Sequence, residues 1–75
     1  MNYHEFIERN PAILLGKPII KGTRISVEII LKKMSEGATI PQLLQSYPFL
    51  NEQQIYAVLA YSSAYISKEE TFEIA

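Results

Sequence analysis

Apolar residues near the start of the chain alternate with turn-forming residues, in a pattern that predicts a short hairpin. Ile13–Leu15 and Pro18–Ile20 are two apolar runs on either side of Gly16-Lys17. A two-residue loop with glycine first is typical of a type II′ hairpin, so these two runs are the expected strands. Pro18 lacks an amide donor and belongs at a sheet edge. Before the hairpin, Tyr3, Phe6 and Ile7 have the spacing of a single helical turn, which Asn10-Pro11 would end.

The rest of the chain shows the spacing of three helices. We expect them at residues 26–37, 39–47 and 51–66. Their first residues are Ser26, Thr39 and Asn51, side chains that cap helix N-termini, and a glutamine three residues after each of the last two completes a capping box. Gly37 and Pro48 end the first two helices. The expected fold is therefore mainly α: a trihelical helix-turn-helix bundle with a short N-terminal β-hairpin, formed as one domain over residues 1–75.

The third expected helix is apolar or small on every side between Ile55 and Ile66. Two short helices and a hairpin can cover only one of its faces. A chain of 75 residues with 48% hydrophobic residues and no cysteine also has little core and no disulfide to stabilise it. We therefore expect a homodimer, with small or aromatic residues of this helix at the interface: Ala57, Ala60, Tyr61 and Ala64. The alternative is a tyrosine-rich surface whose phenol tips lie in water.

Charge is distributed unevenly around a net value of −1. Residues 16–33 carry +4, and the residues from Met34 onward carry −4. A helix-turn-helix would present its third helix to DNA, and the residues placed for contact are Asn51, Gln53, Gln54, Lys32 and Lys33. Since the start of that helix has no cation, we expect any DNA binding to be weak and sensitive to salt. The alternatives are ordinary solvated charges and, for the polar trio, helix caps.

Residues that carry catalytic chemistry are scarce. The single histidine, His4, has Glu5 and Glu8 nearby but no third metal ligand, and the glycines do not form a phosphate loop. The glutamates fall mainly in expected exposed turns and in the C-terminal segment. We therefore expect no enzyme activity, no cofactor and no metal. The start of the chain lacks the features of a signal peptide, and its apolar stretches are too short to span a membrane, so a cytoplasmic protein without membrane contact is expected.

One stretch of the sequence is specific enough to suggest a family. The residues Gly-Lys-Pro-Ile-Ile-Lys-Gly-Thr-Arg-Ile-Ser-Val at 16–27 resemble the signature of the bacterial and archaeal domain of unknown function 433. Later motifs of the same family correspond to Gly37-Ala38-Thr39, Tyr47-Pro48, Leu50 and Ala60-Tyr61. The resemblance covers about residues 10–66, with departures at Ala38 and Pro41 that touch only a turn. It implies a homeodomain-like trihelical fold, a dimer, and a role as a VapB-like antitoxin of a PIN-like ribonuclease.

Two segments are candidates for contact with such a partner or with a second copy. Thr23-Arg24 places a cation just before a helix start, where the helix dipole disfavours it, so Arg24 should have a partner. That partner is another protein or copy, or else a glutamate of the same chain. The acidic tail at residues 67–75 contains Phe72 and Ile74, which are able to order on a basic nuclease groove; the alternative is a frayed terminus.

Overall fold

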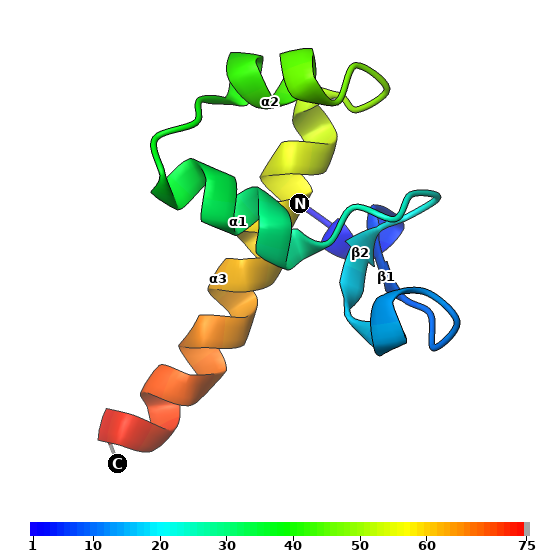
Figure 1. The fold of residues 1–75 in the computed structure, drawn as a ribbon. Helices are drawn as coiled ribbons and strands as arrows, with labels where there is room; N and C mark the ends of the chain where they lie inside the picture. Colours follow the sequence, from blue (N-terminus) through cyan, green and yellow to red (C-terminus); the bar gives the residue numbers. More distant parts are fainter. Residues whose placement is uncertain (75) are drawn as a thin grey trace.

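The computed structural model describes residues 1–74, with side chains described as far as Lys68. It is mainly helical with a short N-terminal hairpin, as predicted (Figure 1). Two short 3-10 helices alternate with the strands in the order η1 (Tyr3–Glu5), β1 (Ile7–Arg9), η2 (Leu14–Gly16) and β2 (Pro18–Ile20). Three α-helices follow, namely α1 (Val27–Ser35), α2 (Ile40–Ser46) and α3 (Glu52–Ile74).

The hairpin pairs different segments from those predicted. Strand β1 lies antiparallel to β2, with Ile7 opposite Ile20 and Arg9 opposite Pro18. This register buries both isoleucines in the core, which explains why β1 replaces Ile13–Leu15 as the partner of β2. The latter run forms the tight turn η2 instead, with Leu15 at φ 58° and 95% exposed. The single helical turn expected near the N-terminus is present only as η1.

The predicted helix caps are confirmed. The Ser26 hydroxyl accepts a hydrogen bond from the Ile29 amide at 3.0 Å. Thr39 and Gln42 form a reciprocal capping box at the start of α2. Gly37, at φ +102°, follows α1 in a conformation that favours glycine, and α2 ends at Ser46, just before Pro48 as expected.

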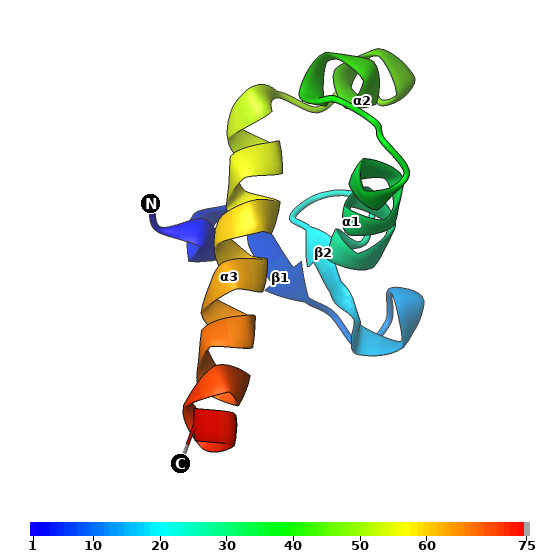
Figure 2. The same cartoon turned by 90° about the vertical axis from the view of Figure 1, so that its left-hand side faces the viewer.

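The core lies between the hairpin, α1 and the first half of α3, and α2 adds to it from the end of the molecule away from the hairpin (Figure 2). Its fully buried members include Ile20, Ile30, Leu43, Ile55 and Val58. Burial of each such side chain contributes about 1.5–3 kcal/mol. Ala57 also has no exposed surface and lies in this core, so its prediction as a dimer contact is wrong.

Helix α3 is longer than predicted. Its expected end was near Ile66, but the helix continues to Ile74 and extends past the rest of the fold in both views (Figures 1 and 2). No proline or glycine follows Ile66, and lysine and glutamate favour helix, which accounts for the extension. The side chains of Phe72 and Ile74 lie outside the described residues. Within the described part of the chain, no helix has the length and apolar character needed to cross a membrane.

Candidate interaction surfaces

The turn between β2 and α1 is held by several hydrogen bonds. The Thr23 hydroxyl donates to the Ile20 carbonyl oxygen at 2.7 Å and accepts from the Ile25 amide at 3.0 Å. Gly22, at φ +79°, donates its amide to a carboxylate oxygen of Glu8 at 3.2 Å. Thr23 therefore stabilises the turn itself, and its half-buried side chain is not free to bind a partner.

Arg24 is exposed on this turn. It forms no hydrogen bond or ion pair with any described side chain, so none of the glutamates up to Glu52 is its partner. Ser26 caps α1 only two residues further along, which places Arg24 near the positive end of the helix dipole. The turn thus presents a cation that no described side chain pairs with.

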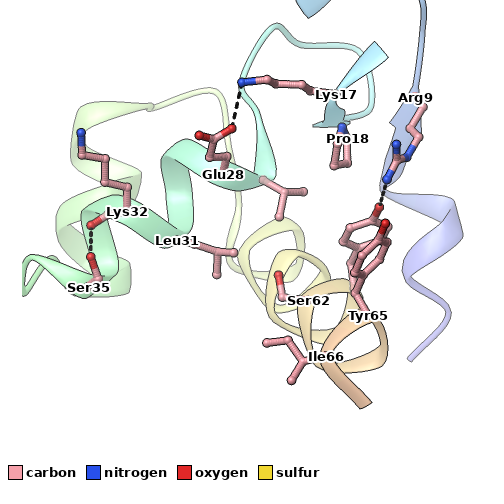
Figure 3. Close-up of a pocket in the computed structure, with 12 residues that line it drawn as sticks. Arg9, Lys17, Pro18, Glu28, Leu31, Lys32, Ser35, Ser62, Tyr65 and Ile66 are labelled. Carbon is pink, nitrogen blue, oxygen red and sulfur yellow. Dashed lines mark hydrogen bonds and ion pairs between the residues drawn. The ribbon is translucent and has the colours of Figure 1, made fainter. Parts of the chain in front are cut away.

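A second surface is the open groove between α1 and the middle of α3, which we call the α1–α3 groove (Figure 3). It encloses about 610 Å³. Residues from α1, from α3 and from the hairpin region line it: Val27, Glu28, Leu31, Lys32, Ser35, Tyr61, Ser62, Tyr65, Ile66, Arg9, Lys17 and Pro18. Its floor is largely apolar, and Ile66 is 54% exposed there.

The rim of the α1–α3 groove is cationic. Lys17 forms an ion pair with Glu28 at 3.0 Å, but both side chains remain mostly exposed. Arg9 donates a hydrogen bond from Nη2 to the Tyr61 hydroxyl at 2.9 Å, and this bond raises the pKa of Arg9 further. Together with Lys32, the lining residues include three cations and one carboxylate, a net charge of +2.

The tyrosines of α3 pack on the N-terminal region. The Tyr61 ring meets Tyr3 edge-on at a centroid distance of 5.5 Å and lies 5.9 Å from Tyr65. Tyr61, a predicted dimer contact, is therefore half-buried within its own chain. Ala60 and Ala64, the other two predicted contacts, are also partly buried.

Comparison with known proteins agrees with the family motifs found in the sequence. The family model described as Protein of unknown function (DUF433) matches residues 7–62, which span the hairpin, α1, α2 and the first half of α3. The chain belongs to the DUF433 family. It is 28% identical over 60 residues to the Uncharacterized protein y4eO of Sinorhizobium fredii, and the match covers 80% of this chain. The matched region is only 27% of that relative's length. No solved structure matches this DUF433 chain.

The residues predicted to contact DNA are only partly available in this DUF433 protein. Asn51 and Gln54 bond reciprocally at the start of α3, amide to side-chain oxygen, at 3.0 and 2.7 Å. Gln53 is exposed. Lys32 lines the α1–α3 groove, whereas Lys33 lies in a separate hollow beside α2, so the two lysines do not form one basic patch.

His4 and the glutamates are the side chains of this DUF433 protein that could ligate a metal ion. No group of three metal-ligating side chains occurs among the described residues. His4 is exposed in η1, with its ring 4.4 Å from that of Tyr3.

Sequence reasoning missed the groove residues Arg9 and Ile66. Arg9 was not singled out because it lies in a strand that was not predicted. Ile66 was placed on the apolar third helix but given no specific neighbour. One signal in the sequence could have indicated such a groove. The apolar run of the third helix is longer than the two short helices that could cover it, so part of it had to stay uncovered.

Proposed function

We propose that this DUF433 protein is an antitoxin-type interaction protein that binds and neutralises a PIN-like ribonuclease in the cytoplasm. The observation that carries the proposal is Arg24, an exposed guanidinium on a hydrogen-bonded turn without an intrachain partner among the described side chains. The resemblance to VapB-like antitoxins supplies the class of partner. A ribonuclease of that class presents carboxylates at its active site, and these are the groups that a guanidinium binds best.

The turn favours such binding because little has to be ordered when the partner arrives. Gly22 and Thr23 fix the backbone just after β2, and Ser26 fixes the start of α1. A preorganised cation loses less conformational entropy on binding than one on a mobile loop. Arg24 would pair with the carboxylates of the nuclease and so make them unavailable for its reaction. In a homodimer, two such turns would be presented.

Where the neighbouring gene encodes a PIN-like protein, the experiment uses that protein, purified together with this chain. We expect Arg24→Ala to weaken the complex by about tenfold to a hundredfold, because a desolvated charge pair loses one partner. Ribonuclease activity should return in parallel. Lys21→Ala is the matched control, since Lys21 is an exposed cation of the same turn whose ammonium group bonds the His4 carbonyl oxygen.

The proposal fails if Arg24→Ala binds and inhibits the nuclease as well as the natural chain does. Equal losses from Arg24→Ala and Lys21→Ala would also contradict it, because they would indicate a general charge effect. The melting temperature of each variant, measured on the isolated protein, separates loss of binding from loss of folding.

DNA binding is the second candidate function, with or without a nuclease partner. It is supported by the succession of α2, the turn at 47–51 and α3, a helix-turn-helix order in which Gln53 is exposed at the start of α3. A protein of this kind would regulate transcription, and an antitoxin would regulate its own operon. Capping already engages Asn51 and Gln54, so Gln53 is the polar side chain best placed to contact a base edge.

A further inference from the structure

The α1–α3 groove leaves apolar surface that the fold itself does not cover. Leu31 contributes from α1 and is partly exposed, while Tyr65 and Ile66 contribute from α3 and are both more than half exposed. Each side chain of this size that stays in water forgoes about 1.5–3 kcal/mol. For a chain of 75 residues this is a substantial part of the free energy of unfolding. The groove is therefore expected to have an occupant.

The same helix that lines the groove also supplies a suitable occupant. After Ile66, α3 continues as far as Ile74 and extends away from the other elements (Figure 1). Since α3 is one continuous helix, its end cannot turn back into a groove that its own middle lines. The same segment of a second copy is not tied to this groove by its own helix, so it is the occupant that the chain itself can supply.

Charge favours this occupant. The groove rim carries a net charge of +2 from Arg9, Lys17, Lys32 and Glu28. The sequence after Ser67 contains one lysine and three glutamates, a net charge of −2, together with Phe72 and Ile74. An acidic segment with apolar residues complements an apolar groove with a cationic rim.

We propose that the α1–α3 groove binds residues 67–74 of α3 from a second copy, in a two-fold symmetric dimer. Because Tyr61, Ser62, Tyr65 and Ile66 of each α3 line the groove, an entering helix also packs on the α3 that it meets, so the exchange is mutual. The interface lies on the groove side of α3 and not on the alanines. The inference does not depend on a nuclease partner, and its test requires only this protein.

The first test compares two substitutions in the same helix by analytical ultracentrifugation at micromolar concentration. Ile66→Glu puts a carboxylate into the groove, and we expect it to weaken dimerisation by about a hundredfold or more. Leu59→Glu is the matched control, because Leu59 is also an exposed apolar residue of α3 but does not line the groove. It should leave the dimer intact.

The second test uses charge and does not alter the apolar floor. Lys32→Glu reverses one rim charge and should weaken the dimer, whereas Lys33→Glu, on the other side of α1, should not. Lys17→Glu together with Lys32→Glu reverses the rim charge to −2. Adding Glu69→Lys and Glu73→Lys, which give the residues after Ser67 a net charge of +2, should then restore dimerisation. If circular dichroism shows that Ile66→Glu does not fold, this set of variants decides the question.

Several results would overturn the proposal. A natural chain that sediments as a monomer has no such interface. A dimer that survives both Ile66→Glu and Lys32→Glu does not use the groove. Dissociation by Ala60→Glu but not by folded Ile66→Glu would place the interface on the alanine side of α3, where the sequence alone predicts it.

Discussion

Leu15 has an unusual backbone conformation, and its side chain does not pack in the core. Leu14, Leu15 and Gly16 follow one another at φ 49°, 58° and 79°, and the Leu15 side chain is 95% exposed. A residue with a Cβ is less stable in this left-handed region by about 1–2 kcal/mol. Such strain in an exposed apolar loop is typical of a segment kept for contact with another molecule.

Replacement of Leu15 by glycine should therefore stabilise the protein. We expect Leu15→Gly to raise the free energy of unfolding by about 0.5–1 kcal/mol, because relief of strain exceeds the added entropy of the unfolded glycine. Urea denaturation followed by circular dichroism measures the change. Leu59→Gly, within α3, should instead destabilise by about 1 kcal/mol. If Leu15→Gly is as destabilising as this control, the loop is not strained.

A hydrogen bond near the start of α3 predicts a pH effect. The Tyr56 hydroxyl donates to a Glu52 carboxylate oxygen at 2.7 Å, and this bond raises the pKa of Tyr56 because ionisation would place a phenolate beside a carboxylate. Its contribution to stability is complete below the unfolded tyrosine pKa of about 10 and is lost as pH rises through the folded value. Glu52→Gln should lower the Tyr56 pKa, measured from the ring signals by NMR. Glu36→Gln should leave it unchanged, and a shift there of equal size would refute the assignment.

The N-terminal caps of α1 and α2 should contribute differently to the stability of the protein. Ser26 is buried where it caps α1, whereas Thr39 caps α2 in an exposed position. Both alanine substitutions should destabilise by about 0.5–2 kcal/mol, with Ser26→Ala the larger, because water can replace the hydroxyl only at residue 39. Urea unfolding of the two variants gives the order directly. The reverse order would mean that the Ile29 amide finds another acceptor.

Local signals explain which elements were predictable. Each cap joins residues three apart, so the starts of α1, α2 and α3 can be inferred from neighbouring letters alone. The hairpin register depends on Ile7 meeting Ile20 in a core that several elements build together, and no local pattern specifies that meeting. The end of α3 was not predicted because the composition favours helix beyond Ile66 and no glycine or proline there gives a local stop signal.

At the level of the entire molecule, one candidate surface could be predicted from neighbouring residues and the other could not. The exposure of Arg24 follows from its place in a turn and was predictable, because the turn residues Gly22 and Thr23 adjoin it. The α1–α3 groove unites Arg9, Leu31 and Ile66, which are far apart in the sequence. The alanines were assigned to an interface from size alone, but Ala57 shows that a small residue also fits tight packing within one chain.

The distribution of lysines predicts how this protein would bind DNA. Asn51 and Gln54 are engaged in a cap, and Lys33 lies on the α2 side of α1, away from the groove where Lys32 lies. We therefore expect about two to four phosphate contacts per dimer, and log K should fall with log salt at a slope of about −2 to −4. Fluorescence anisotropy with a labelled duplex at several salt concentrations measures this slope.

Two variants separate phosphate contacts from base contacts. Lys33→Ala should make the slope shallower by about one for each phosphate that the lysine no longer neutralises, equally on all DNA sequences. Gln53→Ala should alter the base preference and leave the slope unchanged. Tight binding to one site that is insensitive to salt would contradict this account, because the exposed start of α3 would then be supplying most of the affinity through base contacts.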